Sequence, residues 1–246
     1  ARQGGCHRPR APVSTQLADL ADVLRAAANG VFPAADGGWE RAALWLRGVE
    51  AVVAMTGHAF LTVGHDLADV ELDAHGVDGY GGAHHPRVAE LIRGSGWADN
   101  LDVLLVRPTD APRPCGSGPD LVSRDDLAGH PRVAVAQHVR SGIRVLGMPS
   151  RRVRSVVTVA SGVGGLPEIG LQAEGPTSGR ELLDAALRWV DGELGRADPL
   201  VAAVAPGNAR SLRLFLSAGF VPVGSVQLFR PERHPWQGKD AAPETG

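Results

Sequence analysis

The chain has 246 residues, of which 43% are hydrophobic and 21% charged, with a net charge of −2 and a pI near 6.5. The low net charge excludes a disordered polyelectrolyte, and the near-neutral pI argues against a dedicated nucleic-acid binder. No apolar run reaches the roughly 20 residues of a membrane-spanning helix, and the first residues lack the apolar centre of a signal peptide. Only two cysteines are present, Cys6 and Cys115, so no disulfide framework is expected and the cytoplasm is the expected location.

The chain divides at stretches rich in proline and glycine. Residues 1–14 and 232–246 are polar and lack apolar periodicity, so we interpret both as flexible tails. Residues 108–124 hold a dense run of proline and glycine and are interpreted as a linker. This leaves an N-terminal segment at 15–107 and a C-terminal segment at 125–231, which we treat as two domains.

The N-terminal segment predicts a mixture of helices and strands. Apolar residues at helical spacing, or a proline at a helix start, predict helices over residues 16–28 and 86–93. Runs rich in β-branched and aliphatic residues predict a hairpin of residues 49–55 and 59–63, and a buried strand at 101–106. Trp39 and Trp45 flank a further predicted helix and are expected in the core.

The C-terminal segment predicts the order α-β-β-β-α-β-α-β. The expected elements are a helix at 125–139, strands at 142–148, 153–160 and 166–173, a long amphipathic helix at 178–194, a strand at 200–205, a helix at 209–218 and a strand at 221–229. The apolar side chains expected to form the core are Leu182, Leu183, Leu187, Val190, Val201, Val204, Leu212, Phe215 and Phe220.

A run at residues 204–220 carries a more specific pattern, in which a strand is followed by N-x-x-S-x-x-L-F-x-x-x-G-F and a closing strand. The residues that match are Asn208, Ser211, Leu214, Phe215, Gly219 and Phe220. Together with the element order, this run resembles the GNAT superfamily of acyl-CoA-dependent N-acyltransferases over residues 125–230. The resemblance implies a mixed, mostly antiparallel α/β sheet flanked by helices, with a separated central pair of strands. The N-terminal accessory α/β domain could then be a decayed GNAT copy.

The resemblance also implies an acyl-CoA site at the start of the long helix. In the family, a loop of the pattern (Q/R)-x-x-G-x-(G/A) cradles the pyrophosphate with backbone N–H groups at a helix N-terminus. The matching residues are 174–179, where Glu174 replaces the basic or amide residue and Thr177 the central glycine. The residues then expected to bind the cofactor are Thr177, Ser178, Gly179, Arg180, Asn208 and Phe215.

The same loop has another interpretation that needs no ligand. Ser178 and Glu181 have the spacing of a capping box, in which two side chains satisfy the first N–H groups of a helix. In that case the helix N-terminus is closed by its own residues. The sequence leaves both interpretations open.

The resemblance further implies a catalytic base on the strand at 166–173, where Glu168 is the candidate. Gln137 and His138 precede the first strand and are candidates for lining the acceptor site, with a helix-surface role as the alternative. The tyrosine that serves many GNAT enzymes as the acid is replaced by Phe215, and the single tyrosine of the chain is Tyr80. The source of the proton for the leaving thiolate therefore stays open.

These observations lead to one expected function and two alternatives. We expect an N-acyltransferase, most simply an N-acetyltransferase, that moves an acyl group from acetyl-CoA or another acyl-CoA to a small-molecule amine by direct attack. The alternatives are a non-catalytic GNAT-like binding module and a GNAT fold that uses another donor or reaction. The nine histidines show no metal-binding spacing, so no metal is expected. No nucleic-acid or membrane partner is expected either, and a homodimer is among the assemblies that the sequence allows.

Overall fold

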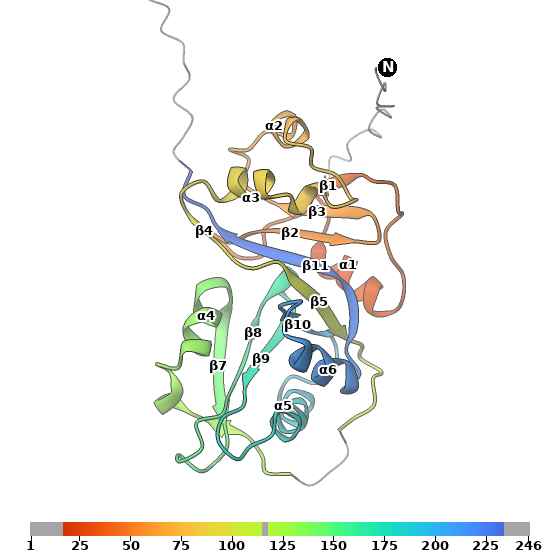
Figure 1. The fold of residues 1–246 in the computed structure, drawn as a ribbon. Coiled ribbons are helices and arrows are strands. Elements are labelled where there is room, and N and C mark those ends of the chain that lie inside the picture. Colours follow the sequence, from red (N-terminus) through yellow and green to blue (C-terminus); the bar gives the residue numbers. More distant parts are fainter. Residues whose placement is uncertain (1–16, 115–117, 234–246) are drawn as a thin grey trace, which may run out of the picture.

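The computed structural model describes residues 17–114 and 118–233, which form one sheet of eleven strands with helices on both faces (Figure 1). In chain order the strands are β1 (Trp39–Arg41), β2 (Glu50–Met55), β3 (His58–Thr62), β4 (Trp97–Ala98), β5 (Asp102–Arg107), β6 (Val122–Ser123), β7 (Ser141–Gly147), β8 (Val156–Ser161), β9 (Pro167–Gln172), β10 (Leu200–Val204) and β11 (Val221–Arg230). The α-helices are α1 (Leu20–Ala28), α2 (Asp69–Ala74), α3 (Pro86–Arg93), α4 (Pro131–Val139), α5 (Gly179–Glu193) and α6 (Ala209–Ser217). Short 3₁₀ turns lie at Gly82–His84, Asp125–Leu127 and Val163–Gly165.

The hairpin of β2 and β3 follows from its turn residues. Thr56 and Gly57 have φ angles of 51° and 85°. Positive φ at both central residues defines a type I′ turn, whose twist matches that of the two strands. The expected hairpin is confirmed, with antiparallel pairing from Ala51–Thr62 to Met55–His58.

Two strands connect the two segments of the chain. β5 belongs to the N-terminal segment but pairs with β10 and β11, which both follow the proline-rich stretch. β11 in turn lies between β5 and β2 and crosses the middle of the molecule in Figure 1. The segments on either side of residues 108–124 therefore share one continuous sheet, and each contributes a strand to the other's half.

β9 and β10 are parallel neighbours connected by α5. Backbone pairing between them occurs at one position in the described chain, Val201 with Glu168, near the start of both strands. By contrast, β9 pairs with β8 along its whole length. The two parallel strands therefore separate toward their C-terminal ends. The expected mixed, mostly antiparallel α/β sheet flanked by helices, with a separated central pair of strands, is therefore confirmed.

The core of the C-terminal half lies between the sheet and the helices α5 and α6. The residues expected in the core are buried, except Leu212, which is partly buried, and all of them but Val201 lie on this face. On the opposite face, α1 and the end of α4 pack on β5, β10 and β11, where the apolar side chains include Leu24, Val139 and Val201. The central strands are thus covered on both faces.

Two expected helices differ in the structure. The helix expected at 125–139 is divided into a 3₁₀ turn and α4, because His130 caps α4 and Pro131 occupies its first position. The helix expected between Trp39 and Trp45 is absent from the described residues, since Trp39 instead begins β1, which pairs with β3. Trp39 is buried as expected, and Trp45 is partly buried against the core.

The expected tails fall mostly outside the described residues, but Glu232 and Arg233 are described. Arg233 forms ion pairs with Glu50 at 2.6 Å and with Asp66 at 2.7 Å. The Glu232 carbonyl accepts a hydrogen bond from the N–H of Ser95. These contacts hold the first residues after β11 against the N-terminal half.

Candidate functional site

Helix α5 begins with a closed first turn. The Ser178 hydroxyl accepts a hydrogen bond from the N–H of Glu181 at 3.1 Å, and the Glu181 carboxylate accepts one from the N–H of Ser178 at 3.0 Å. These reciprocal bonds form the capping box, and the hydrogen bonds that the Ser178 N–H and hydroxyl donate to the Glu181 carboxylate lower the pKa of Glu181. A carboxylate therefore already lies at the positive end of the α5 dipole.

The loop before α5 is tied to neighbouring elements. The Glu174 carboxylate lies 3.1 Å from His130 Nε2 and accepts a hydrogen bond from the Gln172 amide at 2.9 Å. Its N–H donates to the Ser155 hydroxyl at 2.8 Å. Glu174 thus contacts the cap of α4 and the start of β8, and its charge is engaged there.

The first turn of α5 also packs against α6. Arg180 donates to Asp184 at 2.8 Å and to the carbonyl and hydroxyl of Ser217, both at 3.2 Å. A Cβ at Gly179 would lie 3.2 Å from the end of the Leu214 side chain. Because the capping box uses the N–H groups of Ser178 and Glu181, the N–H groups of Gly179 and Arg180 are those that this turn leaves for an anion.

The two candidate cofactor residues at the cap and within α6 have structural contacts. Asn208 is exposed and caps the helix, since its side-chain oxygen accepts from the N–H of Ser211 at 3.1 Å. Phe215 is buried and packs edge-to-face on Phe220, with ring centroids 4.9 Å apart. The Asn–Gly-Phe pattern of the sequence is therefore explained by a helix cap and a core contact.

Glu168 is fully buried on β9, with 1% of its surface exposed. One carboxylate oxygen is bonded to Arg140, and the other accepts from the N–H of Val163 at 3.1 Å. Both oxygens of the candidate base are therefore engaged. His138 and Gln137 are exposed at the end of α4, where the His138 ring packs edge-on against Trp97 at 4.6 Å between centroids.

A group of charged side chains lies beside Glu168 on the face of the sheet that α4 covers. We call it the splay cluster, because it adjoins the separating strands; its members are Asp99, Asp102, Arg132, Arg140 and Glu168. Arg132 belongs to α4 and Arg140 directly follows it, and both lie close to Gly170 of β9. Asp102 begins β5, on the other side of β10.

The pKa values of the splay cluster are shifted, because burial disfavours the charged forms of its side chains and ion pairing offsets this cost only in part. Burial, together with the neighbouring carboxylates of Asp99 and Glu168, raises the pKa of Asp102 to about 6 against the opposing effect of the two arginines. Burial raises the pKa of Asp99 as well. The pKa of Arg132 is lowered by burial and by the like charge of Arg140. Shifted carboxylates of this kind are typical of sites that move protons.

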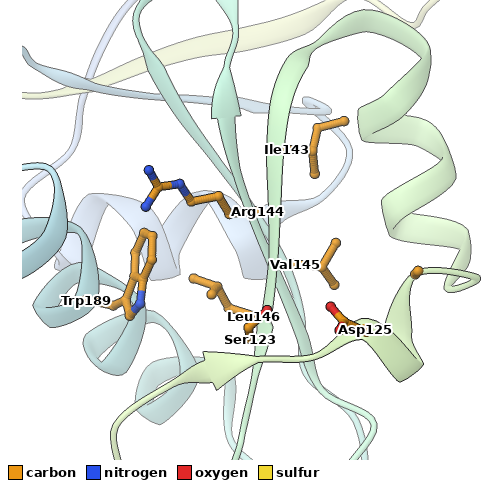
Figure 2. Close-up of a pocket in the computed structure, with 8 residues that line it drawn as sticks. Ser123, Asp125, Ile143, Arg144, Val145, Leu146 and Trp189 are labelled. Atoms are coloured by element: carbon orange, nitrogen blue, oxygen red, sulfur yellow. The ribbon is translucent and has the colours of Figure 1, made fainter.

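A separate pocket of about 460 Å³ lies at the edge of the sheet, around β7 (Figure 2). Trp189 of α5 and Arg144 of β7 line one side, with the guanidinium carbon 5.5 Å from the ring centroid. Ile143, Val145 and Asp125 lie on the other side of the strand. This pocket contains none of the candidate site residues.

Within the described residues, no group of three or more His, Cys, Asp or Glu side chains could hold a metal ion. Among those same residues, no helix is long and apolar enough to cross a bilayer.

The splay cluster was missed in the sequence, apart from Glu168. Its members lie on β9, on or directly after α4, and at or just before the start of β5, and no short motif links them. The β5 position next to β10 is what brings Asp102 to Glu168 and Arg132. The one sequence feature that pointed to this cluster is Asp102, a charged residue at the start of the buried strand β5.

Comparisons with known proteins give weak similarities. No family model matches the chain, and no curated protein matches it. Solved structures that resemble it include a protein assigned to the GNAT family of acetyltransferases from Novosphingobium aromaticivorans, with 16% identity over 54% of this chain and a TM-score of 0.38. A GCN5-related N-acetyltransferase from Kribbella flavida has 17% identity over 61% of this chain and a TM-score of 0.37. In both cases the match covers 65% of the other chain, and similarity at this level identifies neither reaction nor substrate.

Proposed function

We propose that this protein is an acyl-CoA-dependent N-acyltransferase that transfers an acetyl group to the amine of a small molecule. The observation that carries the proposal is the separation of β9 and β10 beyond the Val201–Glu168 pair, with α5 following β9. In a GNAT-like fold, such a separation admits the pantetheine arm of the donor. The splay cluster adjoins the separated strands and supplies carboxylates for an incoming amine.

The proposed reaction is direct attack on the thioester. The amine nitrogen forms a bond to the carbonyl carbon, the carbon–sulfur bond breaks, and its electron pair leaves with the sulfur of CoA. The nitrogen then loses its extra proton to solvent, and the thiolate takes up a proton from solvent. The ammonium must first lose a proton, and Asp102 suits this task because a base with a pKa of about 6 is ionised at neutral pH and still accepts a proton. Glu168 is held by Arg140 and by the N–H of Val163, so we assign it the role of positioning Arg140.

The donor's pyrophosphate would lie at the first turn of α5. The N–H groups of Gly179 and Arg180 and the positive end of the helix favour an anion there. The Arg180 guanidinium is half-exposed and adds a cation. The Glu181 carboxylate opposes a second anion at the same place, so the affinity for the donor depends on how far this carboxylate moves aside.

A second candidate function is a non-catalytic GNAT-like binding module. The capping box favours it, because the start of α5 is then complete without a ligand. Phe215 also favours it, since the position where many GNAT enzymes carry the acid is filled by a core phenylalanine. The two candidates differ in whether acetyl-CoA binds and in whether its thiol is released.

Calorimetry with acetyl-CoA, on the wild type and on Glu181→Gln, tests the donor assignment. We expect the wild type to bind with a Kd below about 1 mM and the variant to bind about two- to tenfold more tightly, because an opposing charge is removed. Glu90→Gln on α3 is the matched control, as Glu90 is also exposed and lies on the N-terminal half. Absence of binding at millimolar acetyl-CoA, or binding without release of thiol in the presence of any amine, would favour the non-catalytic module.

A further inference from the structure

Arg132 has a buried N–H group that the described part of the protein leaves without a hydrogen-bond partner. Its Nε is buried and has no hydrogen-bond partner among the described residues, and no ion pair involving its guanidinium is found there. The same holds for Nε of Arg140, although the Nη2 atom of that residue binds Glu168. A buried N–H group without a partner is costly, so we expect this one to have a partner when the protein functions.

The neighbouring carboxylates do not provide that partner. Asp99 and Asp102 act on Arg132 electrostatically, but neither forms an ion pair or hydrogen bond with it in the described structure. Opposite charges therefore face the same region without touching. A ligand that carries both charges could contact the arginine with one end and the aspartates with the other.

Gly170 allows the arginines to reach this position. A Cβ there would lie 3.4 Å from Arg132 Nε, 3.3 Å from Arg140 Nη1 and 3.0 Å from the Thr158 hydroxyl. The glycine thus lets two guanidinium groups lie against the central strand β9. A ligand bound to Arg132 would consequently lie close to where β9 separates from β10.

We propose that the acceptor is a small zwitterion, an α-amino acid or a close analogue, whose carboxylate binds Arg132 and whose ammonium faces Asp102. This inference rests on the proposed function, and it adds the chemical class of the substrate. An amine without a carboxylate would leave Arg132 unpaired. An anion without an amine would be repelled by the nearby carboxylates. The planar guanidinium can bind a carboxylate with two parallel hydrogen bonds, which also orients the amine.

Binding of the acceptor can be measured without the donor, so its outcome is independent of the proposed reaction. The probes are the proteinogenic amino acids, added singly at about 10 mM in thermal-shift assays, because a ligand that binds only the folded state raises the apparent Tm. Each amino acid that binds is then compared by calorimetry with its decarboxylated amine and its deaminated acid. We expect both truncated compounds to bind at least tenfold more weakly than the amino acid.

Two variants test whether Arg132 binds the amino acid. Arg132→Gln should weaken binding of the amino acid at least tenfold, while a cooperative melting transition shows that the variant still folds. Arg87→Gln on α3, an exposed arginine of the N-terminal half, should leave this binding unchanged. Failure of every amino acid to bind, or binding that is indifferent to Arg132→Gln, would overturn the inference. If an amino acid binds but no acetyl group is transferred, the inference about the acceptor stands and the proposed reaction is rejected.

Discussion

The surroundings of Asp102 determine the pKa of its carboxyl group. The residue begins β5, where Asp99, Glu168 and two arginines surround it and burial raises its pKa to about 6. An aspartate at the surface has a pKa near its ordinary value and is a weak base at neutral pH. The position of β5 therefore decides what this carboxylate can do.

The shifted pKa of Asp102 makes a stability prediction. Because the folded-state pKa is raised, the stabilisation associated with the protonated form is present at low pH and is lost as the pH rises toward and through about 6. Asp102→Asn resembles the protonated form, so it should raise the Tm by about 2–4 °C at pH 7.5, equivalent to about 1 kcal/mol after allowance for solvent screening. The difference from the wild type should vanish near pH 4.

Activity should respond to the same variant in the opposite direction. If Asp102 is the base, the rate of the wild type falls as the pH drops below about 6, and Asp102→Asn lowers kcat about 100-fold or more at every pH. Melting curves and rates measured across pH 4–8 test both parts. A variant that is stabilised but retains the wild-type rate would leave Asp102 with a purely structural role.

At the scale of single elements, α5 shows how local sequence decides a helix start. Ser178 and Glu181 cap the helix in the structure as their spacing predicts. The apolar side chains at helical spacing bury one face against β8, β9 and β10. Both features are determined by neighbours within four residues, which is why the sequence predicted them well.

Removal of the cap should therefore have a measurable and local effect. Ser178→Ala removes the acceptor for the N–H of Glu181 and should destabilise the protein by about 1 kcal/mol, or about 2–4 °C in Tm. Ser95→Ala, which changes a hydroxyl outside any helix cap, is the comparison. Equal Tm values for Ser178→Ala and the wild type would show that the contact with α6 suffices to start the helix.

At the scale of the whole molecule, strand exchange makes the two segments depend on each other. β5 lies between β10 and β11, and β11 lies between β5 and β2. A fragment ending at the proline-rich stretch would lack β11 and leave the apolar edge of β2 unpaired. Neither segment can complete its sheet alone.

We expect residues 15–107 and 118–233 to be unfolded or aggregated when each is expressed separately, and to form a folded complex when co-expressed. Circular dichroism and size-exclusion chromatography distinguish these states. The intact chain cut only within 108–124 is the control, because its sheet is unchanged. A stable, monomeric fragment of residues 15–107 with a cooperative melting transition would contradict this expectation.

The sequence by itself determined the features that depend on near neighbours. The hairpin at Thr56 and Gly57, the cap at Ser178 and the order of elements from residue 125 onward follow from turn chemistry, capping and apolar periodicity, which act over a few residues. The helix expected at 125–139 was wrong in one detail, because Pro131 starts a new helix and does not continue the old one.

Only the tertiary structure decided what pairs across long distances. The insertion of β5 beside β10 joins residues about a hundred positions apart, and it places Asp102 near Arg132, Arg140 and Glu168. The tertiary structure likewise brings Arg140 and the N–H of Val163 to the two oxygens of Glu168, the candidate base of the sequence. Charge–charge interactions and burial depend on distances in space. Those distances follow from the order of the strands in the sheet, which a single sequence does not give.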